Sequence, residues 1–378
     1  MKVLYQLVFV LLFLNCVDQN NRIIHPTKEN TPDISENYVK YINSKISEIN
    51  VESLVASIQD LKIETGINKS NEDYTNLFGF IIDVVIDSKN RIYILDERRQ
   101  DVSIFSENGE FINTIGGKGA GPGETESAKS LSIYNDEWLL INNFNRVEVY
   151  LLKEDEIIFY KTVNFDKPVS NLCVINNTLY TYSPIAIANY TDSDKHSFPL
   201  IHAYSMPDLN HMFSFGESYK SESLPIISQL SFGELSCNES SSTVIFKFNR
   251  FPYMYGYSAS DGSLKWVNIF DELQIPIVEE TRKGGQIGLG FNSKENKYND
   301  TVLRTKAIQD NYQLVQIDRR LIPKKNDFIS ESEVLSFIID TSDGRSTYIG
   351  NNFPRILGVS EELLVGVHSD YVEALILK

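Results

Sequence analysis

Short runs of alternating apolar and polar residues begin near residue 78 and are separated by small groups of polar turn residues. This alternation has the period of a half-buried β-strand. Within the first unit, Asn108-Gly109 separates two runs, and both residue types tolerate the positive φ that a two-residue hairpin turn requires. The unit predicts four antiparallel strands. The first ends at Ile86, and the other three span Arg91–Leu95, Val102–Phe105 and Phe111–Ile115.

The same profile returns along the rest of the chain at a loose period. Later units begin near Leu131, Leu172, Leu235, Ala307 and Ile356. One four-stranded sheet cannot bury both of its faces, whereas a ring of such sheets buries them and leaves no long free edge. The sequence therefore predicts an all-β fold, a six-bladed β-propeller of four-stranded antiparallel blades that occupies residues 58–378.

Two segments do not follow the repeat. The last unit stops soon after its third strand, so we expect residues 58–65 to supply the outer strand of the final blade and close the ring. Residues 277–302, between the fourth and fifth units, fit no strand profile. We expect a long inter-blade loop there that is either functional or disordered.

The N-terminus has the pattern of an export signal. Lys2 precedes a largely apolar run, Val3–Leu14, that is too short for an ordinary transmembrane helix and is followed by Asn15 and Cys16. The segment resembles a bacterial lipoprotein signal in which Cys16 is acylated, although Asn15 stands where a smaller residue is commoner. A plain secretory signal with a coincidental cysteine is the alternative. We expect a signal peptide over 1–16, a tether and N-terminal extension over 17–57, and a lipid anchor in the outer membrane, on its periplasmic or surface face.

Charge and cysteine content narrow the class of partner. The chain has 51 acidic and 35 basic residues, which gives a net charge of −16. A nucleic-acid partner requires a basic surface to replace phosphate counterions, so this class is excluded. Beyond Cys16, only Cys173 and Cys237 remain, and the sequence leaves open whether they form a disulfide or stay as two buried thiols.

The first repeat also carries a family resemblance. DSKNRIYILD (87–96), VSIFSENGEFINTIG (102–116) and GKGAGPGE (117–124) resemble the six-bladed propeller family of secreted and lipid-anchored proteins of Bacteroidetes-type bacteria, a distant relation of the NHL and TolB-like propellers. The resemblance implies an envelope propeller with no assigned enzyme activity. NHL-type repeats often place Arg before the third strand; the first unit has Asp101 there, whereas the second unit keeps Arg146.

Candidate chemistry is sparse. GKGAGPGE is glycine-rich, but Pro122 and Glu124 follow where a phosphate-binding P-loop has Lys and Ser or Thr, so we interpret it as a structural turn. His202 and His211 could approach each other across a hairpin, yet two ligands do not complete a zinc site. Asp83 and Asp96 are weak candidates for Ca²⁺; the alternative is that they accept hydrogen bonds within turns. No catalytic residue is predicted.

Together these patterns favour a non-catalytic binding or scaffold propeller that is anchored in the cell envelope and engages a protein, peptide or glycan. The alternative is a propeller hydrolase or lyase with a divalent metal in the central channel. No other cofactor is expected, and the membrane is a partner only through the lipid anchor.

Overall fold

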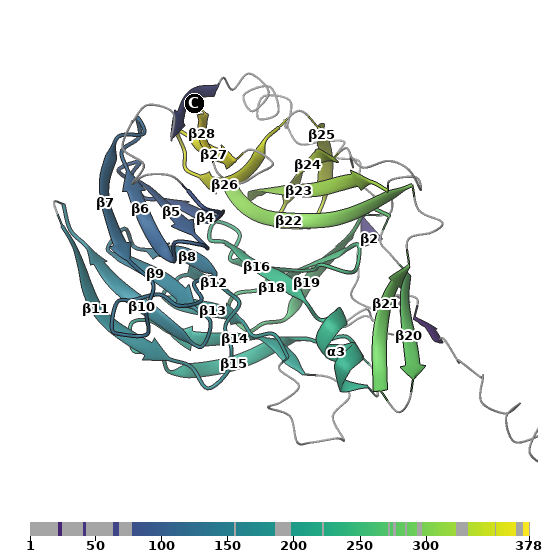
Figure 1. The fold of residues 1–378 in the computed structure, drawn as a ribbon. Coiled ribbons are helices and arrows are strands. Elements are labelled where there is room, and N and C mark those ends of the chain that lie inside the picture. Colours follow the sequence, from purple (N-terminus) through teal and green to yellow (C-terminus); the bar gives the residue numbers. More distant parts are fainter. Residues whose placement is uncertain are drawn as a thin grey trace, which may run out of the picture.

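The structure, a computed structural model, describes fourteen stretches of the chain, which form six repeated sheets and their connections. The described residues are 22–24, 41–42, 63–67, 78–154, 156–185, 198–220, 223–270, 273–274, 277–283, 286–292, 297–322, 332–351, 353–367 and 373–377. Six sheets surround a central channel, and each has four antiparallel strands in the order in which the chain visits them, apart from the additions described below (Figure 1). The prediction of a six-bladed β-propeller is confirmed.

Blades one to three follow one another along the chain with short connections. Their strands, from the channel outward, are β4 (Ile81–Ile86), β5 (Ile92–Asp96), β6 (Asp101–Phe105) and β7 (Phe111–Gly116) in blade one; β8 (Ser130–Tyr134), β9 (Trp138–Asn143), β10 (Arg146–Leu152) and β11 (Ile157–Asn164) in blade two; β12 (Asn171–Ile175), β13 (Thr178–Tyr182), β14 (Pro199–Ser205) and β15 (His211–Glu217) in blade three.

Blade five has the longest strands of the ring, and additional elements occur around blades four to six. Their strands are β16 (Gly233–Asn238), β17 (Thr243–Phe248), β18 (Tyr253–Ser258) and β19 (Leu264–Ile269) in blade four; β22 (Tyr298–Gln309), β23 (Tyr312–Leu321), β24 (Ser332–Asp340) and β25 (Ser346–Gly350) in blade five; β26 (Arg355–Val359), β27 (Leu364–Val367) and β28 (Ala374–Leu377) in blade six. The helix α3 (Leu224–Leu230) connects blades three and four and buries Ile226, Ile227 and Leu230.

An N-terminal strand completes the last blade. β3 (Ile63–Ile67) pairs antiparallel with β28, so blade six has three strands from the C-terminus and one from the N-terminal part. The expected ring closure is confirmed, with the strand slightly later than the 58–65 that strand counting suggested. Closure of this kind joins the two ends of the ring by backbone hydrogen bonds.

Each interface between neighbouring blades has its own hydrophobic cluster, six in all. The strand β5 shows how one strand serves two of them. Ile92 and Ile94 face the cluster with blade six, whereas Tyr93 and Leu95 face the cluster with blade two. Successive side chains of a strand point to opposite faces, so every inner strand contributes to both neighbours. Each buried aliphatic side chain adds roughly 1.5–3 kcal/mol of burial free energy.

Glycines serve two purposes in the blades: they allow positive φ angles in hairpin turns and leave room for large side chains. Gly109, Gly262 and Gly344, the second residues of three Xaa-Gly hairpins, have φ angles of 80°, 72° and 81°. Gly256 serves a different purpose, because a Cβ there would lie 2.1 Å from the ring of Trp266. Trp266 is buried between blades four and five, so this glycine permits the largest side chain of that cluster to fit.

The segment 277–302 corrects one prediction. It contains the hairpin of β20 (Ile277–Lys283) and β21 (Gln286–Asn292) and then the start of β22, so it is not a long loop. The hairpin lies at the edge of the ring (Figure 1). The expectation is wrong because a projecting hairpin need not follow the alternation of a blade strand, and glycines are also typical of loops. Glycine in a strand weakens but does not exclude it.

Two strands occur within 17–57, where a tether and N-terminal extension were expected. β1 (Arg22–Ile24) pairs antiparallel with β20, and β2 (Tyr41–Ile42) pairs parallel with β19 as a fifth strand of blade four. Residues 1–16, over which a signal peptide is expected, lie outside the described residues, and so does Cys16. In the part of the chain that is described, no helix is long and apolar enough to cross a membrane.

Candidate functional site

A cavity of about 250 Å³ lies in the central channel, lined by the innermost strands of all six blades. Its charged lining residues are Asp83 from β4, Glu234 from β16 and Lys306 from β22. The remaining wall combines polar side chains with half-buried aliphatic ones such as Ile86, Ile133 and Val359. Concave sites with a few polar groups in apolar surroundings are the usual places for ligands, so this channel is the candidate functional site.

Asp83 and Lys306 form an ion pair across the channel wall. Lys306 Nζ lies 2.9 Å from Asp83 Oδ1 and also donates to the Val84 carbonyl at 3.2 Å. Asp83 Oδ2 accepts from the backbone N–H of Leu131 in blade two at 2.8 Å. Since blade six lies between blades five and one, the pair links two blades that are not neighbours. One carboxylate therefore connects the inner strands of blades one, two and five.

Glu234 forms the second charged position. Its carboxylate lies 3.5 Å from Nζ of Lys247, whose side chain is only 2% exposed while that of Glu234 is 27% exposed. Lys247 Nζ donates to the Val302 carbonyl at 2.6 Å and to Asn249 at 3.3 Å. The lysine thus lies behind the glutamate and is held by blades four and five. It compensates the charge of Glu234 while the carboxylate remains at the cavity.

Several uncharged polar side chains complete the wall. Ser236 and Thr305 hydroxyls lie 2.6 Å apart, and Gln313 Nε2 donates to both, which joins blades four and five. By contrast, Asn171 Oδ1 is buried without a hydrogen-bond partner among the described residues. The channel therefore holds both satisfied polar groups and groups with unused hydrogen-bonding capacity.

A disulfide forms another part of the wall. Cys173 on β12 is bonded to Cys237 on β16, with their Cα atoms 5.8 Å apart, and both residues line the cavity. The bond joins the innermost strands of blades three and four. It resolves the alternative that the sequence left open, in favour of pairing.

The two aspartates considered for Ca²⁺ are not brought together. Asp83 pairs in register with Leu95, so Asp96, the next residue, belongs to the opposite face of the sheet. The Asp96 carboxylate accepts from four backbone N–H groups, those of Gly79, Phe80, Arg98 and Arg99. Asp96 therefore accepts hydrogen bonds within a turn, which is the alternative to Ca²⁺ binding. Among the residues that the structure describes, no group of three His, Cys, Asp or Glu side chains is arranged to hold a metal ion.

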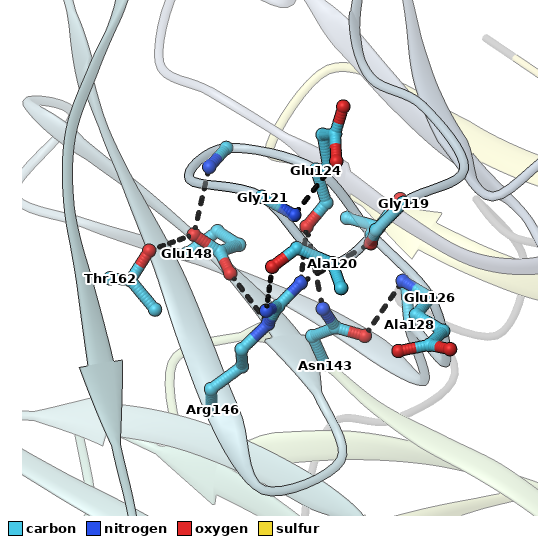
Figure 2. A network of polar contacts seen from close by, with 12 residues as sticks. Gly119, Ala120, Gly121, Glu124, Glu126, Ala128, Asn143, Arg146, Glu148 and Thr162 are labelled. Carbon is cyan, nitrogen blue, oxygen red and sulfur yellow. Dashed lines mark hydrogen bonds and ion pairs between the residues drawn. The ribbon is translucent and has the colours of Figure 1, made fainter.

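The glycine-rich loop forms a second polar centre, at the junction of blades one and two (Figure 2). The guanidinium of Arg146 donates to the carbonyls of Gly119, Ala120 and Glu124 at 3.3, 2.7 and 3.0 Å. A phosphate cradle presents backbone N–H groups, whereas here carbonyl oxygens converge on a cation. The loop geometry is therefore unsuited to phosphate, in agreement with its interpretation as a structural turn.

Glu148 holds the other side of the same centre. Its fully buried carboxylate lies 2.9 Å from Arg146 Nε and accepts from the Gly123 N–H and the Thr162 hydroxyl at 3.1 and 2.6 Å. Tyr150 donates to the Gly123 carbonyl at 2.5 Å. Burial, followed by the nearby Glu148 charge, raises the pKa of Tyr150 to about 12, so the phenol stays protonated as a donor. Arg146 is the residue type that the resemblance placed before the third strand.

Blade one has a different arrangement at the equivalent position. Asp101 begins its third strand and pairs with Arg99 at 2.9 Å. Burial raises the pKa of Asp101, an effect that the Arg99 charge opposes. The Arg-to-Asp departure is thus accommodated by a local partner of opposite charge.

The expected approach of His202 and His211 is observed. Their rings are 6.2 Å apart, and Ser214 lies between them, 2.7 Å from His202 Nδ1 and 2.9 Å from His211 Nε2. His202 is buried, while His211 and Ser214 are exposed on the outer strand of blade three. His25, His196 and His368 lie outside the described residues.

Sequence reasoning missed the channel residues Glu234, Asn171 and Lys306. Each lies on an innermost strand, where local alternation gives no sign that a polar residue faces the channel. Only their blade equivalence could have suggested it, because polar residues recur on the first strand of several units.

Comparisons with known proteins agree with this architecture. A family model described as "6-bladed beta-propeller" matches residues 30–249. No curated protein matches the chain. Among solved structures, a Bacteroides vulgatus protein of the duf4221 family has a TM-score of 0.52 and 12% identity, covering 84% of this chain and 97% of that one.

Two further Bacteroides structures are similar. A Bacteroides fragilis protein described as exported has a TM-score of 0.53 and 14% identity, covering 88% of this chain and 97% of that one. An auxiliary nutrient binding protein from Bacteroides thetaiotaomicron has a TM-score of 0.45 and 12% identity, covering 84% and 77%. At identities this low, the likeness of the first two structures shows a shared fold and gives no information on the ligand.

Proposed function

Because the chain belongs to the six-bladed β-propeller family, we propose that it is a non-catalytic binding propeller of the cell envelope that holds a protein, peptide or glycan ligand at its central channel. The observation that carries the proposal is the cavity itself. Six inner strands contribute to it, and polar groups with unused hydrogen-bonding capacity line it. Polar groups left unsatisfied by a protein are usually satisfied by water or a ligand.

The disulfide supports the envelope part of the proposal. Disulfides persist in oxidising compartments such as the periplasm and the cell surface, and they are rare in the cytosol of mesophiles. The Cys173–Cys237 bond is therefore in keeping with the export signal of the N-terminus. Acylation of Cys16 would then hold the propeller at the outer membrane.

Binding is tested with a variant that fills the cavity. Ala307 lines the channel and is exposed, so Ala307→Trp places an indole where the ligand would enter. Ala120, exposed on the glycine-rich loop, gives the matched control Ala120→Trp. The unlipidated protein, residues 17–378, is immobilised and exposed to envelope extract. We expect wild type and Ala120→Trp to retain a ligand that Ala307→Trp does not; equal retention by all three would overturn the channel assignment.

Anchoring is tested independently in cells. Full-length protein should incorporate an alkyne-labelled palmitate and fractionate with membranes, whereas Cys16→Ala should incorporate none. Incorporation that persists in Cys16→Ala, or that is absent from wild type, would overturn the lipid anchor and leave the channel proposal unaffected.

A further inference from the structure

The size of the channel cavity limits what can enter it. Sites for whole drug-sized ligands usually measure about 300–1,000 Å³. The cavity here is about 250 Å³, so it accommodates one end group while the remainder of a larger ligand stays outside. This inference rests on the proposed binding function and concerns the chemistry of that group.

The charges of the wall are already compensated by the protein. Asp83 lies 2.9 Å from Lys306, and Glu234 lies 3.5 Å from Lys247. The side chains of Asp83 and Lys247 are only 3% and 2% exposed. A charged ligand would bring an uncompensated charge into this partly desolvated space, which is costly. The pairing therefore favours an uncharged group.

The hydrogen-bonding groups that remain are both donors and acceptors. Lys306 uses two of its three N–H donors on Asp83 and Val84. Ser132 lines the cavity, and its hydroxyl makes no hydrogen bond to the described residues. Asn171, also in the wall, has a buried amide oxygen without a partner among those residues. Glu234 adds a carboxylate whose nearest cation is beyond ordinary hydrogen-bond distance. A ligand that suits this mixture must donate and accept at several points.

We infer that the channel binds a single uncharged polyhydroxyl group, of the kind found at the end of a glycan. Each hydroxyl of such a group both donates and accepts, as the wall requires. Its C–H surface can contact the half-buried aliphatic side chains of the wall, including Ile86, Ile133 and Val359. The inference selects the glycan among the ligand classes of the proposed function.

The test uses named probes against residues 17–378. Glucose, galactose, mannose, N-acetylglucosamine and their methyl glycosides are compared with tetralysine and tetraglutamate by saturation-transfer NMR and calorimetry, at 50 and 500 mM NaCl. We expect at least one neutral sugar to bind, with an affinity that changes less than about twofold with salt, because screening weakens only interactions between charges.

Two serine variants localise the binding. Ser132→Ala removes a cavity hydroxyl that forms no hydrogen bond within the described protein, so folding should be unchanged, while loss of one hydrogen bond should weaken sugar binding about fivefold. Ser88→Ala removes an exposed hydroxyl in the first turn of blade one and should change neither. Equal affinity of wild type and Ser132→Ala would overturn the assignment of the site.

The outcomes separate this inference from the proposed function. Suppose that wild type binds tetralysine or tetraglutamate but no sugar, and that Ala307→Trp loses this binding. The polyhydroxyl inference would then be overturned, and the proposal of a binding propeller would stand. The inference would also be overturned if the protein binds none of the sugars while Ala307→Trp fails to retain the envelope ligand that wild type retains. If the protein binds none of the sugars, and wild type and Ala307→Trp retain the envelope ligand equally, both the inference and the channel assignment are overturned.

Discussion

At the glycine-rich loop, the polar groups of the centre meet partners from the protein. Three carbonyls receive the Arg146 guanidinium, and Glu148 accepts an N–H and a hydroxyl at Oε2 while its Oε1 pairs with Arg146. In the channel, ion pairs and a disulfide hold the wall together, but Ser132 and Asn171 keep unused capacity beside a cavity. Both regions are rich in polar residues and both lie between blades. Only in the channel do such groups lie beside a cavity that a ligand can enter.

This contrast distinguishes polar residues that stabilise the fold from polar residues that are available to a ligand. A fully satisfied buried network rigidifies its surroundings, whereas an unsatisfied buried group costs free energy unless a ligand or water completes it. Changes at the loop should therefore alter stability alone. Changes at the channel should divide between residues that hold the wall and residues that meet the ligand.

The largest expected effect is at the loop. Arg146→Leu leaves the buried carboxylate of Glu148 and three loop carbonyls without their cation, so the free energy of unfolding should fall by about 3–5 kcal/mol. Urea unfolding followed by tryptophan fluorescence measures it. Lys153→Ala is the matched control, because the Lys153–Glu156 pair is 49% and 60% exposed and should contribute less than about 1 kcal/mol. Similar losses for both variants would contradict the contrast.

The next largest effect is expected at the channel disulfide. Cys173→Ala/Cys237→Ala should lower the free energy of unfolding by about 2–4 kcal/mol, because the bond restricts the unfolded chain. A reducing agent should lower the unfolding midpoint of wild type toward that of the double variant and leave the double variant unchanged. A midpoint that does not respond to reduction in wild type would show that the bond contributes little.

The ion pair of the channel should follow. Lys306→Met removes the cation from Asp83, whose side chain is 3% exposed, but leaves the Leu131 and Val84 N–H groups to satisfy the carboxylate. We expect a loss of roughly 2 kcal/mol, smaller than at Arg146 because of that remaining support and because Lys306 is partly exposed. A double-mutant cycle with Asp83→Asn measures the coupling. Zero coupling would contradict the link between blades one and five.

Much of the fold was accessible from sequence because its cause is local. In blade one, β4 to β7 appear at the predicted positions, since alternation and Xaa-Gly turns such as Asn108-Gly109 act over a few residues. Closure by an N-terminal strand followed from counting strands, and β3 pairs with β28 as that count required. The β20–β21 hairpin was missed because it projects from the ring and lacks the pattern of a blade.

The candidate site was not accessible in the same way. Lys306 and Asp83 are brought together only when blades one and five are placed around the same channel. Ser132 has no local feature that distinguishes it from other strand serines. Arg146 was singled out by its residue type, yet its carbonyl partners became visible only in three dimensions. Long-range placement, rather than local pattern, decides which polar residues meet.

A third place tests the same contrast by pH. His202 is buried, its Nε2 has no partner among the described residues, and burial, then the charges of Lys167 and His211, lower its pKa from 6.5 to about 3. Between these values the unfolded chain binds a proton that the folded protein does not, so stability must fall as the pH is lowered from 6.5 toward 3. The slope is at most about 1.4 kcal/mol per pH unit, or about 1.4 kcal/mol in total at pH 5.5.

The measurement is the difference in slope between wild type and variants. His202→Gln cannot take up this proton, so the fall in unfolding free energy from pH 7 to pH 5 should be smaller than in wild type by about 1.9 kcal/mol. His211→Gln, which changes an exposed ring that also contacts Ser214, should keep most of the wild-type slope. If His202→Gln and wild type lose stability in parallel, the imidazole is already able to accept a proton in the folded protein. A buried atom without a hydrogen-bond partner in the structure would then not identify free hydrogen-bonding capacity in this propeller, either at His202 or in the channel.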